Sequence, residues 1–320
     1  MNFPVFDLHC DTALALLNLG NTGRKQLAEN DLHWDLKRAA PSGGCQCFAC
    51  FTTPEMRQWY HKTPEDIFEL ELAGILGQLE QNGDRISQAF TPEQILENRR
   101  LGKMSAILTI EGPAGFGYDP ELLENLHQIG FAASTLGWNE QNVLTGSHAT
   151  GSGLTDRGRE YVKECQRLGI LVDVSHISDA GFWDILSMTQ APVIATHSNS
   201  RSICGHSRNL TDDMFLEICR TGGVAGINLY TEFLGERPDL DKVCDHILHW
   251  LKLDAQGEHI ALGGDLDGCD SLPAGFDGVQ SYPALAQRLL QRGVGQQIVE
   301  NIYWNNAMGV FMNAVRHHKK

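Results

Sequence analysis

Two histidines in the middle of the chain each follow a short apolar, β-branched run. His176 comes after Ile170–Val174, and His197 comes directly after Pro192–Thr196. The residues between the runs have a helix-compatible pattern, so the segment predicts a strand–helix–strand unit with parallel strands. A single histidine at a strand end is more often a hydrogen-bonded structural group. Two imidazoles at the same end of neighbouring strands can converge on one point, and a metal is the usual reason for such convergence.

A histidine and an aspartate follow the first apolar run of the chain. Val5–Leu8 reads as a strand, with His9 and Asp11 just beyond it. Because side chains alternate along an extended segment, His-x-Asp is expected to place both groups on one face. An imidazole and a carboxylate that project together suit a metal ion. The alternative is that Asp11 caps a helix predicted over Thr12–Leu19.

Two further carboxylates follow apolar runs. Glu111 ends Ser105–Ile110 before a Gly-Pro turn, and Asp265 follows Ile260–Gly263. A carboxylate that emerges from a fully apolar strand is rarely only solvated. As ligands, the three histidines together with Asp11 and Glu111 exceed what one catalytic zinc needs. They suit two metal ions, about 3.5–4 Å apart, that share a bridging carboxylate and a bridging water and hydrolyse a polarised carbonyl.

Strands and helices alternate along the whole chain, without a linker-like break in composition. The predicted strands are Val5–Leu8, residues 44–53, Ser105–Ile110, Phe131–Leu136, Ile170–Val174, Pro192–Thr196, Gly223–Leu229 and Ile260–Gly263. The sequence therefore predicts a single domain over residues 1–320, an α/β protein of the (β/α)₈ TIM-barrel class. In this architecture chemistry lies at the C-terminal ends of the strands, which is where all the residues named above fall.

The predicted rim also carries groups for proton transfer and substrate binding. Asp265, on the last strand, is placed to take a proton from the bridging water and return it to a leaving amine. An arginine after the sixth strand, Arg208 or Arg201, could hold a substrate carboxylate in a bidentate grip. The expected reaction class is therefore metal-assisted hydrolysis.

Composition and charge narrow the class of protein. Of 320 residues, 42% are apolar and 20% charged, which is ordinary for a globular enzyme. The 25 basic and 40 acidic residues give a net charge of −15, which argues against nucleic acid or an anionic membrane as partner. The N-terminus lacks a basic region before its apolar residues, and nine cysteines make an odd number. We expect reduced thiols and a cytoplasmic location.

Three closely spaced cysteines raise the possibility of a metal or iron–sulfur site. Cys45, Cys47 and Cys50 lie within the second predicted strand. The alternation of Cys45, Cys47 and Ala49 is typical of small residues on one face of a buried strand, where free cysteine packs as a small hydrophobe. No second cysteine pair nearby completes a four-ligand cage, so the structural interpretation is favoured.

Six short motifs, in order, resemble the signature of the renal (membrane) dipeptidase family of zinc metallopeptidases: DLHCD, TIEG, DVSH, ATHSNSR, the HSRN after it, and ALGGDLDG. The resemblance covers nearly the whole chain. It implies a di-zinc barrel related to the amidohydrolases, commonly a homodimer, that cleaves free L,L and possibly L,D dipeptides. It also implies that His9, Asp11 and Glu111 bind one zinc ion and that Glu111, His176 and His197 bind the other. Arg208 would grip the substrate carboxylate, and Asp265 would engage the amino terminus and handle the proton. Tyr230 would present backbone near the substrate carboxylate.

One position departs from the family pattern. Trp138 stands where family members carry a histidine that contacts the scissile carbonyl. Either Trp138 donates a hydrogen bond, or His148 replaces the missing imidazole, or the substrate differs. The alternatives that remain are an amidohydrolase-type enzyme acting on a cyclic amide, lactone, phosphoester or N-acyl amino acid, and a barrel that binds metal without activity.

Overall fold

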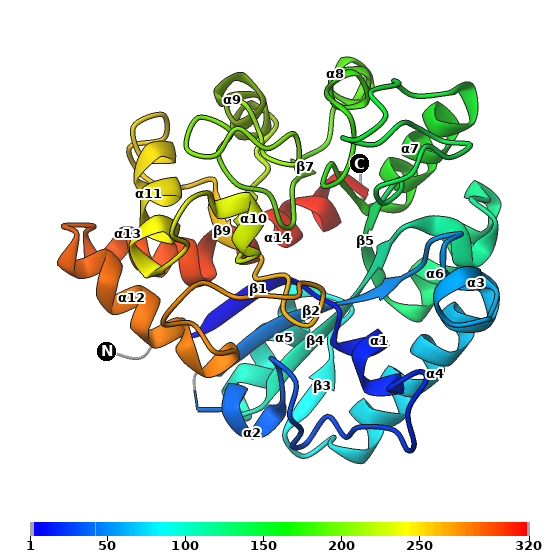
Figure 1. Ribbon diagram of the computed structural model, residues 1–320, viewed down its shortest axis with the longest axis horizontal. Coiled ribbons are helices and arrows are strands. Elements are labelled where there is room, and N and C mark those ends of the chain that lie inside the picture. The colour runs from blue at the N-terminus through cyan, green and yellow to red at the C-terminus, as the bar shows by residue number, and fades with distance from the viewer. Residues whose placement is uncertain (1–2, 42, 319–320) are drawn as a thin grey trace.

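Eight parallel strands form a nearly closed barrel with helices outside it (Figure 1). The computed structural model describes residues 3–41 and 43–318. The strands follow the order β7-β6-β5-β4-β2-β1-β9-β8, and a bridge between Ala195 and Ala225 joins its two ends. Their bounds are β1 Val5–Cys10, β2 Gly44–Phe51, β4 Met104–Glu111, β5 Phe131–Thr135, β6 Leu171–Asp173, β7 Val193–Ile194, β8 Ala225–Ile227 and β9 Ile260–Leu262. The predicted (β/α)₈ barrel is confirmed.

One further strand was not predicted. β3, Ile86–Gln88, pairs in parallel with Met104–Ala106 at the start of β4. It occupies the first part of the β4 edge, and β5 pairs with β4 only from Leu108 onward. Three residues with a single buried apolar side chain give no periodic signal, so the sequence pattern could not reveal this strand.

The barrel interior is filled by alternate residues of its strands, as the period of two requires. Interior positions include Phe6, Leu8, Cys45, Cys47, Ile107, Ala133, Leu171, Ile194, Val224 and Ala261. Trp304 and Phe311 pack on this cluster, Phe311 from the last helix, α14. Full burial of each large apolar side chain stabilises the fold by about 1.5–3 kcal/mol.

Several of the helices begin at threonine caps. Thr63 and Thr91 form capping boxes, and Thr211 accepts a hydrogen bond from the Met214 amide. The helices are α1 Thr12–Leu17, α2 Leu36–Ala39, α3 Met56–Trp59, α4 Pro64–Gln81, α5 Pro92–Arg100, α6 Leu123–Ile129, α7 Asp156–Leu168, α8 Asp179–Met188, α9 Asp212–Arg220, α10 Thr231–Leu234, α11 Leu240–Trp250, α12 Tyr282–Gln291, α13 Gln296–Glu300 and α14 Asn306–His318. Among the helices described, none has the length and apolar character needed to cross a membrane.

The cysteines are free thiols, and those of β2 belong to the core. Cys45, Cys47 and Cys50 are at most 1% exposed, and burial raises the pKa of each thiol well above its usual value. Within the described part of the chain, the groups that could hold a metal contain no cysteine. The cysteines of β2 therefore pack as core residues, as predicted.

Candidate metal centre

Six polar side chains from different parts of the sequence meet at the C-terminal rim of the barrel. They are only 1% to 9% exposed. His9 is the next-to-last residue of β1, Glu111 is the last residue of β4, and the others follow β1, β6, β7 and β9. The set comprises His9, Asp11, Glu111, His176, His197 and Asp265. The structure therefore brings together all the residues that the sequence suggested as metal ligands, with Asp265 beside them.

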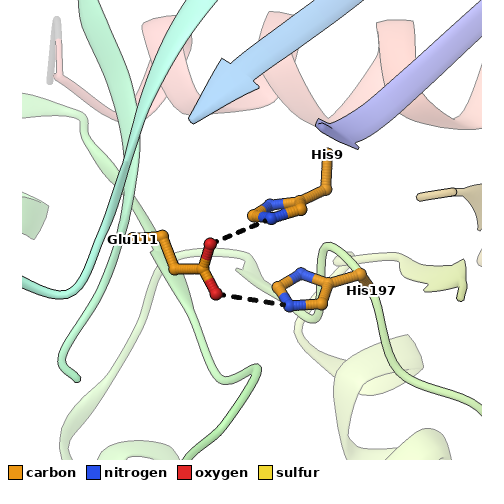
Figure 2. Close-up of side chains that lie close together, drawn as sticks. All are labelled: His9, Glu111 and His197. Atoms are coloured by element: carbon orange, nitrogen blue, oxygen red, sulfur yellow. Dashed lines mark ion pairs between the residues drawn. The ribbon is translucent and has the colours of Figure 1, made fainter. Parts of the chain in front are cut away.

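Glu111 lies in the middle of the group. Its Oε2 is 3.1 Å from Nε2 of His9, and its Oε1 is 2.9 Å from Nε2 of His176 and 3.8 Å from Nε2 of His197. Figure 2 shows one oxygen of the Glu111 carboxylate facing the ring of His9 and the other facing the ring of His197. Because each oxygen faces a different set of imidazoles, the carboxylate has the arrangement of a bridge between two positions.

Asp11 reaches the site by a different backbone path from the one predicted. It lies 3.3 Å from Nε2 of His9, measured at Oδ2. Its φ of −99° and ψ of 21° are not extended, so the proximity to His9 does not come from strand alternation. β1 is also irregular between Asp7 and Cys10. Asp11 does occupy the N-cap position of α1, as the alternative predicted, but its side chain makes no capping hydrogen bond to the helix.

The donor atoms of the site fit a pair of cations. His9 Nε2 and Asp11 Oδ1 are buried and make no hydrogen bond within the described chain, and Nε2 of His176 faces Nε2 of His197 at 2.9 Å. Two groups, His9–Glu111–His197 and His9–Asp11–Asp265, each offer ligand atoms within 4.8 Å of one another. Imidazole and carboxylate are the ligands that zinc takes in catalytic sites. Bound cations would satisfy these atoms.

Burial and neighbouring charges shift the pKa values of the site histidines. Burial, with the nearby charge of Arg208, lowers the pKa of His176 well below its usual value, and burial, with His9, does the same for His197. Burial also lowers the pKa of His9, but Glu111 and Asp11 outweigh it and raise that pKa. The two carboxylates thus favour a positive charge at this position.

The pKa values of two carboxyl groups of the site are also raised. Burial and the charge of Glu111 raise the pKa of Asp11 to about 6, and burial raises the pKa of Asp265 to about 7. Oδ2 of Asp265 accepts a hydrogen bond from Asn228 at 3.0 Å, whereas its Oδ1 faces Nε2 of His9 at 3.9 Å. Carboxylates crowded in this way are typical of sites that hold cations.

Two of the site residues adopt left-handed backbone conformations. His176 has a φ of 68° and Asp265 a φ of 56°. Such conformations are uncommon for residues other than glycine and cost on the order of 1–3 kcal/mol. They persist where the surroundings require a particular side-chain direction, and here both side chains point into the metal centre.

Arg208 provides a buried positive charge next to the site histidines His176 and His197. It is 3% exposed, and its Nη1 donates to Ser198 Oγ at 3.0 Å, whereas Nε and Nη2 have no hydrogen-bond partner in the described chain. Burial lowers its pKa to about 10. Arg201, the alternative from sequence, is instead engaged by Asp179 at 2.7 Å and 2.8 Å. Arg208 is therefore the arginine that can accept a further anion.

Trp138 packs against two other aromatic side chains and against the site residue His176. Its ring centroid is 6.2 Å from that of His176, 5.3 Å from that of Phe51 and 5.6 Å from that of Trp59. Trp59 is 43% exposed. We call Phe51, Trp59 and Trp138 the aromatic surface; it lies on the side of the rim formed by β2 and β5.

His148 is not free to replace the missing imidazole. Its Nε2 lies 3.0 Å from Oδ1 of Asn139 and its Nδ1 lies 2.9 Å from Oγ of Ser207. Burial lowers its pKa to about 4. The same oxygen of Asn139 lies 2.9 Å from Nδ1 of His176, so His148 helps to hold the group that orients a site histidine.

Tyr230 lies on the same side of the rim as Arg208. Its ring packs edge-on against Phe233 at 4.9 Å, and the guanidinium of Arg208 lies over the Phe233 ring at 5.6 Å. The Tyr230 amide is held by Asn228 Oδ1 at 2.6 Å.

Sequence reasoning missed the residues that hold the ligands in place. Asn139 and Asn228 contact His176 and Asp265, and an added Cβ at Gly268 would collide with the carboxylates of Asp11 and Asp265. Gly268 lies in the quoted DLDG motif, which was the available signal. The asparagines stand in loops with no distinguishing pattern.

Comparison with known proteins finds dipeptidases and metallopeptidases. An uncharacterized dipeptidase of Schizosaccharomyces pombe is 31% identical over 312 residues, covering 90% of this chain and 74% of its own. The chain spans 53% to 74% of the length of the curated relatives it matches. A metallopeptidase from Rhodobacter sphaeroides, solved with a phosphinate mimic of the dipeptide L-Ala-D-Ala, has a TM-score of 0.87 and 25% identity, covering 98% of this chain and 100% of that one.

A second solved structure supports the same relationship. The dipeptidase AC, a metallopeptidase of family M19, has a TM-score of 0.87 and 26% identity, covering 98% of this chain and 99% of its own. The family model for membrane dipeptidase, peptidase family M19, matches residues 1–320. The resemblance drawn from the six motifs is confirmed, and the chain belongs to the membrane dipeptidase family, peptidase family M19.

Proposed function

We propose that this protein is a metallo-dipeptidase that holds two zinc ions and hydrolyses the peptide bond of free dipeptides, L,L and possibly L,D. The observation that carries the proposal is the buried guanidinium of Arg208, which lies beside the candidate metal centre. Two of its nitrogens have no hydrogen-bond partner among the described residues. A free carboxylate is the group that would complete it. A family member of similar fold binds a phosphinate mimic of a dipeptide, which supports the substrate class.

Five residues would hold the two ions. His9, Asp11 and Glu111 would bind one, and Glu111, His176 and His197 would bind the other, with Glu111 shared. The two-sided contacts of Glu111 support this division. When bound, two zinc ions supply Lewis-acid polarisation of the scissile carbonyl and activation of the attacking water.

The chain's own residues would bind the substrate and move the proton. Arg208 binds the C-terminal carboxylate, with the backbone near Tyr230 beside it. Asn228 holds Oδ2 of Asp265, which leaves Oδ1 to meet the amino terminus, accept a proton from the attacking water and return it to the leaving amine. A substrate that lacks either free end would leave one of these buried charged groups unpaired.

Trp138 would determine which substrate side chains are preferred. It would not stabilise charge on the scissile carbonyl. Indole donates one hydrogen bond and cannot become charged. Its contacts with Phe51 and Trp59 extend an apolar surface to within 6.2 Å of His176. A dipeptide residue whose side chain faces β2 would therefore be apolar or aromatic. Arg208 follows β7, which stands opposite β2 in the strand order of the barrel, so the residue facing β2 would be the N-terminal one.

A hydrolysis screen with zinc-loaded protein tests the proposal. The matrix contains L,L and L,D dipeptides, each also in N-acetylated and C-amidated form, together with N-acyl amino acids. Breaking a buried charged pair costs about 3–5 kcal/mol, so blocked dipeptides should fall in kcat/KM by about two orders of magnitude or more. Equal turnover of free and blocked substrates, or preference for N-acyl amino acids, would contradict it.

A further inference from the structure

The Nδ1 side of His197 is connected to a buried carboxylate through a threonine. Oγ1 of Thr196 lies 2.7 Å from Nδ1 of His197 and donates a short hydrogen bond to Oδ2 of Asp173. The three side chains are only 1% to 3% exposed. We call Asp173, Thr196 and His197 the His197 hydrogen-bond chain. We propose that Asp173 and Thr196 are positioning residues that fix the tautomer of His197 so that the lone pair of Nε2 faces the metal centre.

The tautomer follows from counting hydrogens. A threonine hydroxyl has one hydrogen and can otherwise only accept. The carboxylate of Asp173 only accepts, so the hydroxyl hydrogen of Thr196 must point to Asp173. The Thr196 oxygen is then an acceptor toward His197, and Nδ1 of His197 must carry the hydrogen. The neutral imidazole therefore has its lone pair on Nε2, the atom that Figure 2 shows directed toward Glu111.

The rest of the surroundings hold this arrangement in place. Oδ1 of Asp173 accepts hydrogen bonds from the amides of Ser175 at 2.9 Å and Thr196 at 3.0 Å, which ties the ends of β6 and β7 together. The His197 amide donates to Ser175 Oγ at 3.2 Å, and that oxygen lies 3.4 Å from Thr196 Oγ1. Asp173 therefore cannot turn away from Thr196 without losing two backbone hydrogen bonds.

The chain makes an unusual prediction for Asp173→Asn. The amide oxygen would stay with the two backbone N–H groups, and the NH₂ group would face Thr196 and donate to it. The Thr196 hydroxyl would then turn and donate to Nδ1 of His197, which moves the imidazole hydrogen to Nε2. An isosteric change outside the metal centre would thus aim an N–H at the metal position.

The experiment compares the wild type with Asp173→Asn, Thr196→Val, Thr196→Ser and the control Thr109→Val. Thr109 is a buried threonine of β4 whose hydroxyl has no hydrogen-bond partner in the described chain. Long-range ¹⁵N NMR of metal-free, histidine-labelled protein reads the His197 tautomer, chelator competition reads zinc affinity, and thermal melting checks folding.

We expect the Nδ1–H tautomer in the wild type and the Nε2–H tautomer in Asp173→Asn. Loss of a group that orients a metal ligand typically lowers metal affinity about 10–100-fold, so both Asp173→Asn and Thr196→Val should weaken zinc binding by this factor. Thr196→Ser restores the hydroxyl and should bind as the wild type does, and so should Thr109→Val.

An Nε2–H tautomer in the wild type, or unchanged tautomer and zinc affinity in Asp173→Asn, would overturn the proposal. If Asp173→Asn does not fold, the pair Thr196→Val and Thr196→Ser decides it: equal zinc affinity in both would contradict the hydrogen-bond chain. The inference rests on the proposed metal site but not on the substrate. Protein that shows the predicted tautomers and affinities yet cleaves no dipeptide would support it and contradict the proposed function.

Discussion

Nε2 of His176 lies 2.9 Å from Nε2 of His197. The other nitrogen of each ring is close to a protein oxygen, Asn139 Oδ1 at 2.9 Å for His176 and Thr196 Oγ1 at 2.7 Å for His197. If both rings carry their hydrogen on Nδ1, two lone pairs face each other in a buried site. A shared cation would convert this repulsion into two ligand bonds, which is the physical basis of the metal prediction.

Metal-loaded protein should contain close to two zinc equivalents. In Glu111→Gln, one carboxylate oxygen becomes an NH₂ group that cannot bind a cation, so the zinc content should fall to one equivalent or fewer by elemental analysis. Glu140→Gln is the matched control, since Glu140 lies at the same rim and contacts Thr53 and Tyr118 instead. A limit of one equivalent in the wild type, unchanged in Glu111→Gln, would rule out the bridged site.

Replacing Arg208 should weaken substrate binding without lowering the stability of the fold. Arg208→Met keeps a long side chain but removes the charge, so KM for free dipeptides should rise by about two orders of magnitude, from the ~3–5 kcal/mol of a broken buried pair. The free energy of unfolding of the metal-loaded protein should be unchanged or higher, because the change removes two buried nitrogens that have no hydrogen-bond partner in the part of the chain that the structure describes. A strongly destabilised variant with normal KM would show that Arg208 is only structural.

The aromatic surface should determine which dipeptides are preferred. Trp138→Ala removes an apolar contact worth about 1.5–3 kcal/mol, so kcat/KM for a dipeptide with an N-terminal aromatic residue should fall roughly 10- to 100-fold. Turnover of Gly-Ala should change little. Trp183→Ala, at a 44% exposed position on α8, is the control. Equal losses for both substrates would indicate a general role for Trp138 in the reaction.

The sequence predicted the fold and the ligands where an apolar run followed by a polar residue recurs along the chain. It did not predict features that depend on contacts between distant residues. Each ligand at a strand end was visible because an apolar run stops at a polar residue. Asp11 was found for a partly wrong reason, since its backbone is not extended. The choice between Arg208 and Arg201 required the ion pair that Asp179 forms from the start of α8. The link from Asp173 to Thr196 joins different strands and leaves no local signal.

The last prediction concerns Gly268, which packs against two carboxylates of the site. A Cβ at this position would collide with Asp11 Oδ2 and Asp265 Oδ1, both held in a buried cluster. In Gly268→Ala these carboxylates must move, so the ion at His9, Asp11 and Glu111 should be lost, and zinc content should drop by about one equivalent together with activity. Gly268 does not have a positive φ, so the effect should not come from backbone strain.

The control for this change is Gly309→Ala in α14, where nothing lies within 4 Å of an added Cβ. Alanine in a helix interior is favoured over glycine by about 0.5–1 kcal/mol, so this variant should melt slightly higher and keep both ions. Thermal melting with elemental analysis distinguishes the two variants. If Gly268→Ala retained two zinc equivalents and full turnover, Asp11 and Asp265 would not be fixed by their contacts in this site, and the assignment of Asp11 as a ligand would fail.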